Sequence, residues 1–389
     1  MSATLMRKRR FGYQPALDGV RALAILSVMA FHGGLWFARG GSIGVLVFFV
    51  LSGLLITRLL LDECQQTGRI RLGQFYVRRF LRLGPALFLV LAVSALVAAT
   101  HPQWPFSAAT LHSIPPVLFY VGNWVWAFHS STGVLGVLGH LWSLAVEEQF
   151  YLLWPMALVV MLARGVRLRA VLAVALVGAV ASELARVRLW QHVTAGTPFR
   201  MSGTDAAASG LLVGCAAACA LMLWPSVVAR VAKLAFWPAA AVLAAVTVKG
   251  PNPPLSLRAF DTVAWPAVDL SAAIILCHLI SAPRAVVARV LGARPLRPLG
   301  RISYGVYLWH LPVFVWLSLR FHLDTWAHFA VGFAVTLAIC CCSWVLVEKP
   351  ALRLKGRFQP RRTQPAPAPA PVPVAEDEGD AVWLAPRLA

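Results

Sequence analysis

Charged side chains are scarce in this sequence. Only 13% of its 389 residues are Asp, Glu, Lys or Arg, whereas 59% are hydrophobic. A soluble globule of this length needs far more polar surface, so the composition excludes a soluble fold and predicts an all-α protein that crosses a membrane many times. Acidic residues are especially few, with 15 Asp and Glu against 35 Lys and Arg.

The sequence also lacks the signatures of several other protein classes. Its arginines lie between apolar segments, which favours membrane topology over a nucleic-acid partner. Its seven cysteines have neither zinc-site nor secreted-disulfide spacing. The successive residues Cys340, Cys341 and Cys342 point about 100° apart on a helix and cannot converge on one ion. We therefore expect no bound metal, and we find no internal repeat and no soluble catalytic domain.

Apolar segments of membrane-spanning length are abundant. About 20 residues cross the ~30 Å hydrocarbon layer. Ten stretches qualify, at residues 17–38, 43–61, 84–100, 141–163, 170–188, 206–224, 234–249, 262–281, 303–320 and 326–347. Residues 106–136 are broken by Pro115-Pro116 and Gly122, which predicts a re-entrant or interfacial segment.

The basic residues predict the orientation. With the N-terminus inside, all but seven of the 35 Lys and Arg lie on the inner side, and this is a strong positive-inside bias. Ten spans then place both termini in the cytoplasm. We predict a basic cytoplasmic N-terminus (1–16), a transmembrane domain (17–350) and a disordered Pro/Ala-rich, then acidic, cytoplasmic tail (351–389). No small-residue cleavage site follows Leu26, so we expect the first span to be retained.

The first span carries two ionisable residues on one helix face. Arg21 and His32 are eleven residues apart, which corresponds to three turns plus about 20° and a rise of about 16 Å. With Arg21 at the inner membrane surface, His32 lies near the middle of the bilayer. An ionisable residue at that depth usually faces a protein interior or a water-filled cavity and has a functional partner.

A second polar cluster lies at the outer end of the fourth span. Ser143 and Glu147 are four residues apart and share a helix face, and Glu148 follows directly. Buried carboxylates need a cationic or protonated partner. Either Glu147 or Glu148 can fix the tautomer of His32 and raise its basicity, which suits a general base acting on a hydroxyl. A structural His–Glu pair between helices is the alternative.

A third cluster contains three arginines on the inner side. Arg78 and Arg82 are four residues apart and Arg79 lies between them. This spacing suits the binding of phosphates by planar guanidinium groups. The alternative is that each arginine only stops translocation and meets lipid headgroups.

A fourth cluster opens the ninth span. Ser303, Tyr307 and His310 have offsets of four and seven residues, so they form an inward polar stripe on one helix. Trp309 beside them is interpreted as a packing aromatic.

Six stretches in this order carry a family resemblance. They are Leu17 to His32, Phe48 to Ile56, Arg78 to Pro85, Trp142 to Tyr151, Gly300 to Pro312, and Glu348-Lys349-Pro350. Together they resemble the membrane-bound acyltransferase 3 family, whose members O-acylate sugars, glycosylated antibiotics and surface polysaccharides. Two places depart from the family pattern. Leu46 stands where the family often has Asp, and Ala207 and Ser209 replace an Arg and an Asp that often follow the retained Asp205.

The resemblance implies an acyl-CoA donor, commonly acetyl-CoA, that enters from the cytoplasm. The phosphates of the donor would be held by Arg78, Arg79 and Arg82. Arg21 would lie at the cytoplasmic entrance of the site. His32 would deprotonate a hydroxyl of a carbohydrate, lipid-linked glycan or macrolide-type acceptor. Further substrate contacts are expected from Asp18, Ser143, Asp205, Ser303, Tyr307 and His310. The expectation is a multi-pass enzyme of a bacterial cytoplasmic membrane, surrounded by membrane lipids.

Two other interpretations remain open. A transporter or exporter of a glycoside could use His32, Glu147 and Glu148 as a proton or cargo site, although the sequence shows no inverted repeat. A non-catalytic membrane receptor or scaffold would leave the buried acids unexplained. Consumption of acetyl-CoA separates the enzyme from both.

Overall fold

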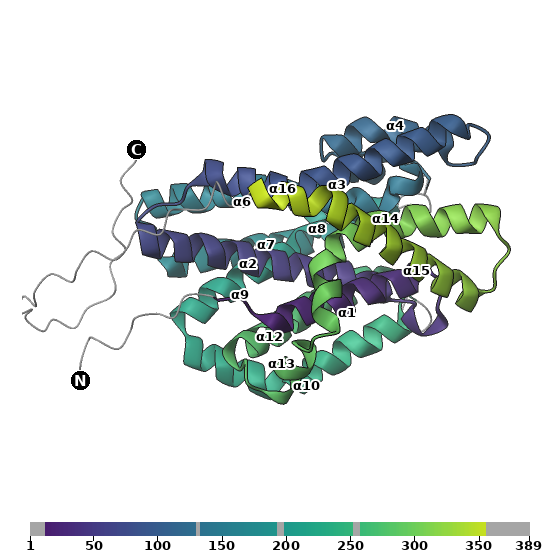
Figure 1. Ribbon diagram of the computed structural model, residues 1–389. Helices are drawn as coiled ribbons and strands as arrows, with labels where there is room; N and C mark the ends of the chain where they lie inside the picture. Colours follow the sequence, from purple (N-terminus) through teal and green to yellow (C-terminus); the bar gives the residue numbers. More distant parts are fainter. Residues whose placement is uncertain (1–11, 130–132, 193–197, 252–256, 355–389) are drawn as a thin grey trace, which may run out of the picture.

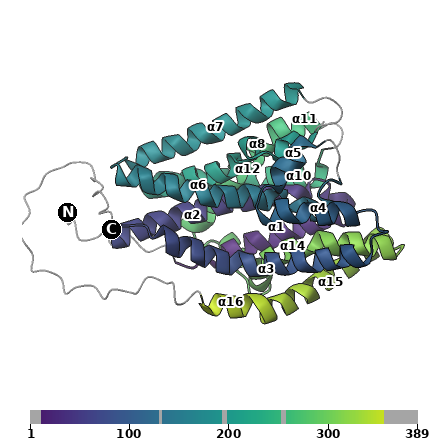
Figure 2. The ribbon, with the colours of Figure 1, turned by 90° about the horizontal axis from the view of Figure 1, so that it is seen from above.

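The computed structural model describes residues 12–129, 133–192, 198–251 and 257–354. Within these ranges the chain forms helices and no strands, which confirms the predicted all-α, polytopic membrane fold. Figures 1 and 2 show the long helices lying side by side as one bundle. They are α1 (Pro15–His32), α2 (Gly44–Thr67), α3 (Leu72–Thr100), α6 (Trp142–Ala163), α7 (Leu168–His192), α9 (Ser209–Leu223), α10 (Pro225–Lys249), α12 (Trp265–Ser281), α14 (Leu296–Arg320) and α15 (Thr325–Ser343).

Short helices connect the long ones. Two of them, η6 and η7, are π-helical turns that continue directly into or out of a long helix. The short helices are η2 (Trp36–Ala38), η3 (Gly41–Ile43), α4 (Ser107–Leu118), α5 (Gly122–Phe128), η4 (Gly136–Leu141), η5 (Pro198–Ser202), α8 (Thr204–Ala207), α11 (Leu257–Ala259), η6 (Phe260–Ala264), α13 (Val286–Leu291), η7 (Trp344–Glu348) and α16 (Lys349–Leu354). Most of the two predicted tails lies outside the described residues.

The helices match the predicted spans. In the part of the chain that the structure describes, nine helical stretches are long and apolar enough to cross a membrane, and the shorter apolar α9 adds a tenth segment. Helices α4 and α5 have 12 and 7 residues, which is too short to cross ~30 Å. The described part of the stretch 106–136 therefore contains no helix long enough to span, in agreement with the prediction. Which end of the bundle faces the cytoplasm stays a prediction.

Helix α1 lies inside the bundle, with α14 along one side (Figure 1). Ile25, Val28 and Met29 in its middle have no exposed surface. Near its start the backbones of α1 and α14 touch, because a Cβ built on Gly300 would lie 1.9 Å from the carbonyl oxygen of Asp18. This close approach lets residues of the two helices share one site.

Helices α2 and α9 approach each other equally closely. A Cβ built on Gly53 would lie 1.8 Å from the carbonyl oxygen of Leu211, and one built on Gly214 would lie 2.1 Å from that of Val50. Small residues at such a crossing let membrane helices pack backbone to backbone. The two glycines thus let α9 pack directly against the backbone of α2.

Candidate active site

Three histidines meet where α1, α14 and η4 come together. His32 is the last residue of α1, His310 lies in α14 and His140 in η4. The ring centroids of His32 and His310 are 5.0 Å apart, and so are those of His140 and His310. His310 has no exposed surface, and His140 is 4% exposed. The sequence predicted His32 and His310 as site residues, whereas it assigned no role to His140.

Hydrogen bonds determine the tautomers of His310 and His32. His310 Nδ1 lies 2.6 Å from the carbonyl oxygen of Tyr307, which can only accept, so Nδ1 carries the proton and Nε2 a lone pair. His310 Nε2 lies 3.2 Å from His32 Nδ1, so His32 Nδ1 donates to it. The same Nδ1 lies 3.1 Å from the carbonyl oxygen of Val28. The other nitrogen of a neutral His32, Nε2, is therefore unprotonated and able to accept a proton.

Bonds around His140 tie η4 to α14. Its Nε2 donates to the carbonyl oxygen of Leu308 over 3.2 Å. The hydroxyl of Tyr307 donates to the carbonyl oxygen of His140 over 2.5 Å and lies 2.6 Å from Ser143 Oγ. Ser303 is buried on α14, the helix that carries Tyr307. Ser143 and Tyr307, which the sequence named separately as substrate contacts, thus bond to each other, and their hydroxyls hold the histidine cluster in place. Among the residues that the structure describes, no three His, Cys, Asp or Glu side chains are arranged to hold a metal ion.

The two acids of α6 do not reach His32. Glu147 Oε1 accepts hydrogen bonds from Ser52 Oγ over 2.7 Å and from the hydroxyl of Tyr151 over 3.2 Å. Glu148 Oε1 lies 3.6 Å from Arg79 Nε. The expectation that Glu147 or Glu148 orients His32 therefore needs correction, since His310 takes that position. The reason is distance along the chain, because Glu147 lies seven residues, or about 10 Å of helical rise, beyond His140.

Three of the four predicted arginines gather at the other end of α1. Arg21, Arg79 and Arg82 interact electrostatically with one another. The guanidinium of Arg79 also lies 3.4 Å from the ring centroid of Tyr151. Arg21 Nη1 lies 3.3 Å from Asp18 Oδ1. These residues form a group of clustered positive charges, which we call the arginine cluster (Arg21, Arg79 and Arg82).

Asp18 and Arg78 have more local contacts. Asp18 is buried, and its Oδ2 lies 2.5 Å from the hydroxyl of Tyr13 and 3.6 Å from Arg301 Nε. Its carboxylate therefore compensates part of the positive charge near Arg21. Arg78 Nη2 lies 3.7 Å from Glu63 Oε2 at the end of α2. That contact turns Arg78 toward α2, whereas Arg79 and Arg82 turn toward Arg21.

Asp205 lies away from the histidines. It forms a bidentate ion pair with Arg200, with N–O distances of 2.9 and 2.7 Å, and Arg200 lies 5.3 Å from the ring centroid of Trp124. The sequence had placed Asp205 among substrate-binding residues. The structure shows a charge pair beside an aromatic side chain on α5, with no contact to the histidine cluster.

Ser209, which replaces the family Asp, is bonded by charged residues of two other helices. Arg186 of α7 has no exposed surface, and its Nη2 lies 3.2 Å from Ser209 Oγ. Ser209 Oγ in turn donates to Asp269 Oδ2 of α12 over 2.8 Å. Arg186 also pairs with Glu183 at 3.1 Å. An arginine of α7 and an aspartate of α12 therefore meet at Ser209 of α9.

The sequence analysis assigned no site role to two polar residues near the arginine cluster, Tyr120 and Glu348. Tyr120 has φ +55°, the only positive φ of a non-glycine residue in the described chain, and its carbonyl oxygen accepts from Gln149 over 2.6 Å. It interacts electrostatically with Glu148 and Arg79. Glu348 is buried in η7, accepts from Ser343 over 3.1 Å and interacts with Arg82. Only the motif containing Glu348 gave a signal in the sequence.

Comparison with known proteins identifies the family. The chain matches a family described as an acyltransferase domain over residues 14–345. It is 36% identical over 324 residues to the peptidoglycan O-acetyltransferase OatA of Listeria monocytogenes, covering 77% of this chain and 49% of that protein. It is 31% identical over 324 residues to the O-acetyltransferase OatA of Staphylococcus aureus, covering 79% and 51%. The chain thus spans about half the length of these relatives. No solved structure matches. The chain therefore belongs to the membrane-bound acyltransferase 3 family.

Proposed function

We propose that this protein is a membrane O-acyltransferase that moves an acetyl group from acetyl-CoA to a hydroxyl of a carbohydrate. The observation that carries this proposal is the His310–His32 hydrogen bond of 3.2 Å, which leaves His32 Nε2 as a proton acceptor at one end of α1. The relatives support the acyl group and the acceptor class, because they are O-acetyltransferases and one acts on peptidoglycan.

The arginine cluster supports coenzyme A as the carrier of the acyl group. Its phosphates can pair with guanidinium groups through charge-assisted hydrogen bonds. Arg82 is exposed and Arg21 partly exposed, so a ligand can reach them. Arg21 and His32 are eleven positions apart on α1, a rise of about 16 Å. The pantetheine arm of coenzyme A would extend over that distance toward the histidines.

The transfer needs one proton acceptor and no covalent enzyme intermediate. His32 Nε2 takes the proton of the acceptor hydroxyl, whose oxygen attacks the thioester carbonyl carbon. The carbon–sulfur bond breaks, and the leaving thiolate takes the proton back from His32. While His32 is charged, its Nδ1–H remains bonded to His310 and to Val28. Among the described residues, no Ser, Cys or Thr side chain bonds a ring nitrogen of His32, His140 or His310, which supports direct transfer without an enzyme nucleophile.

Labelled donor and a His32→Ala variant test this proposal. We expect purified wild-type protein in detergent to transfer isotope-labelled acetyl from acetyl-CoA to a glycoside, and His32→Ala to lose about 10²–10⁴-fold in kcat, which is the usual contribution of a general base. Mass spectrometry of the glycoside measures the transfer. His112→Ala, on the exposed face of α4, is the control and should match wild type. Undiminished transfer by His32→Ala would contradict the mechanism, and no consumption of acetyl-CoA would favour a transporter.

A further inference from the structure

A group of charged and polar side chains lies inside the bundle between α7, α9 and α12, and the proposed acetyl transfer does not use it. We call it the Asp269 cluster (Glu183, Arg186, Ser209 and Asp269). Figure 2 shows α7 along the edge of the bundle opposite α15 and α16. Arg186 has no exposed surface, and Asp269 is 1% exposed. Ionisable groups that lie so deep in a membrane domain usually have a function.

The guanidinium of Arg186 is fully engaged by other groups of the cluster. Its Nη1 donates to both carboxylate oxygens of Glu183, each over 3.1 Å. Its Nη2 donates to the carbonyl oxygen of Ala206 and to Ser209 Oγ. Glu183 is therefore the counterion of Arg186, and Asp269 has no direct hydrogen bond to a cation.

The two carboxyl oxygens of Asp269 differ in their surroundings. Oδ2 accepts a hydrogen bond from Ser209 Oγ over 2.8 Å. Oδ1 is buried and has no hydrogen-bond partner in the described chain. It lies against Gly210, where a Cβ would be only 2.7 Å from Oδ1. A buried carboxylate with a single hydrogen bond is costly as an ion, because burial penalises the charged form most.

The charges around Asp269 do not balance if its carboxyl group is ionised. Within the described chain Asp269 interacts electrostatically with Arg186 and Glu183 of α7, and with no charged residue of α2 or α10, which also pack against α12. Asp261 of η6, about two helical turns earlier, interacts with Arg186 as well. One guanidinium thus faces three carboxyl groups. A carboxyl group in such a position takes up a proton instead of staying ionised.

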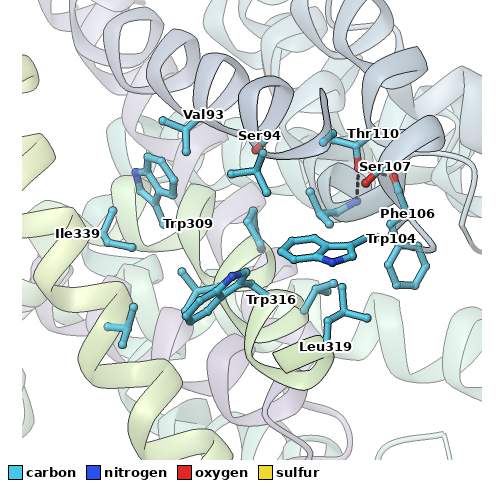
Figure 3. Close-up of a pocket in the computed structure, with 17 residues that line it drawn as sticks. Val93, Ser94, Trp104, Phe106, Ser107, Thr110, Trp309, Trp316, Leu319 and Ile339 are labelled. Atoms are coloured by element: carbon cyan, nitrogen blue, oxygen red, sulfur yellow. Dashed lines mark hydrogen bonds between the residues drawn. The ribbon is translucent and has the colours of Figure 1, made fainter. Parts of the chain in front are cut away.

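Thr110 shows how a buried polar side chain is satisfied elsewhere in the bundle. It lies at the wall of the apolar cavity between α3, α4, α14 and α15 (Figure 3). Its Oγ1 donates to the carbonyl oxygen of Phe106 over 2.7 Å and accepts from the Val137 N–H over 3.2 Å, the dashed line in the figure. Backbone groups complete this site, whereas neither the backbone nor a second side chain of the described residues reaches Asp269 Oδ1.

We propose that Asp269 is a proton-binding site inside the membrane domain. Its carboxylate takes one proton from bulk water and becomes a neutral carboxylic acid, with the O–H on Oδ1 and the bond from Ser209 kept on Oδ2. Loss of this proton leaves an uncompensated negative charge between α9 and α12, so the contact between these helices depends on pH. The site is independent of the proposed acetyl transfer. A sodium ion at Oδ1, or water beside an ionised carboxylate, is the alternative.

Infrared spectroscopy tests the protonation directly, because a neutral carboxylic acid has a C=O stretching band that an ionised carboxylate lacks. The sample is the full chain at neutral pH in a detergent without ester groups, with and without isotope-labelled aspartate. We expect a band that shifts with the label and disappears in Asp269→Asn. Ser209→Ala should move the band to higher frequency, because it removes the hydrogen bond to Oδ2. Asp205→Asn is the matched control and should leave the band unchanged, since Asp205 is ion-paired with Arg200.

Three results overturn the proposal. The first is a wild-type spectrum without this band, which indicates an ionised carboxylate beside water. The second is a band that persists in Asp269→Asn. The third is a band that is lost when sodium chloride replaces potassium chloride, which indicates a sodium ion. If Asp269→Asn does not fold, an unchanged band frequency in Ser209→Ala overturns the assignment to Asp269.

Thermal unfolding tests whether the proton controls helix packing. A group that binds a proton only in the folded state makes stability fall as pH rises. We therefore expect the melting temperature of the wild type to fall between neutral and alkaline pH by more than that of Asp269→Asn, whose amide stays neutral. Asp205→Asn should keep the wild-type dependence. The same pH dependence in the wild type and Asp269→Asn would contradict the proposed link between the proton and the α9–α12 contact.

Discussion

The partner of His32 decides how this residue can act. A carboxylate partner would add a negative charge and raise the basicity of the imidazole. His310 instead donates its Nδ1–H to the carbonyl oxygen of Tyr307, and its Nε2 is a neutral acceptor for His32 Nδ1–H. It fixes which nitrogen of His32 carries the proton without adding a charge to a buried site, where an unpaired charge is costly.

Substitution of His310 should show this positioning role. His310→Ala removes the acceptor of His32 Nδ1–H, so either nitrogen of His32 can carry the proton, and we expect kcat to fall about 10–100-fold, as for other residues that orient a functional ligand. His310→Gln should recover part of the activity, because its amide oxygen can accept the same bond. Steady-state kinetics and the pH profile of kcat measure both effects.

A purely structural role of His310 predicts a different outcome. Both variants would then lower the melting temperature in detergent, and the pH profile of the remaining activity would keep its wild-type shape. Equal loss in His310→Ala and His310→Gln, without rescue, would argue against the tautomer function.

The sequence predicted which residues are polar and deep, but not which of them meet. Spacing put Arg21 and His32 on one face of one helix, and α1 carries both as expected. It could not fix the rotation of α6 or its height relative to α1. Glu147 and Glu148 therefore looked like partners of His32, although Ser52 and Arg79 from α2 and α3 bind them.

At the level of helices, hydropathy was sufficient to predict the membrane spans, because each span had to cover the same hydrocarbon thickness. The sequence also excluded α4 and α5 as membrane spans, because their stretch is broken by Pro115-Pro116 and Gly122. It could not predict the positive φ of Tyr120 or the π-helical turn that carries Glu348. Both depend on tertiary contacts, since an unfavourable backbone conformation persists only when its surroundings stabilise it.

The crossing of α2 and α9 should be sensitive to a single methyl group. Gly214→Ala would place a Cβ 2.1 Å from the carbonyl oxygen of Val50, so the helices must separate, at a cost of about 1–3 kcal/mol as for other overpacked sites. We expect a lower melting temperature in detergent, measured by tryptophan fluorescence. Gly73→Ala is the control, because nothing lies within 4 Å of its Cβ position. An unchanged melting temperature for Gly214→Ala would mean that the helices can separate without cost.

At the level of the whole molecule, α1 connects two sites of different chemistry. The arginine cluster lies toward its start and the histidine cluster at its end, in one continuous helix of 18 residues. The polar group formed by Arg186, Ser209 and Asp269 belongs to a different part of the bundle, between α7, α9 and α12. In the proposed function, the donor and the acceptor would therefore approach from opposite ends of α1.

The proposed function predicts acetyl transfer across a sealed membrane. In proteoliposomes with a water-soluble glycoside trapped inside, acetyl-CoA added outside should acetylate the trapped glycoside through those molecules whose arginine cluster faces outward. Acetyl-CoA cannot cross the bilayer itself, because its phosphate charges are not soluble in hydrocarbon. Mass spectrometry of the lumen measures the product, and liposomes with His32→Ala give the background. Acetylation that occurs only when donor and acceptor share a compartment would show that α1 does not join two sides of the membrane, since both substrates would then enter the site from the same end.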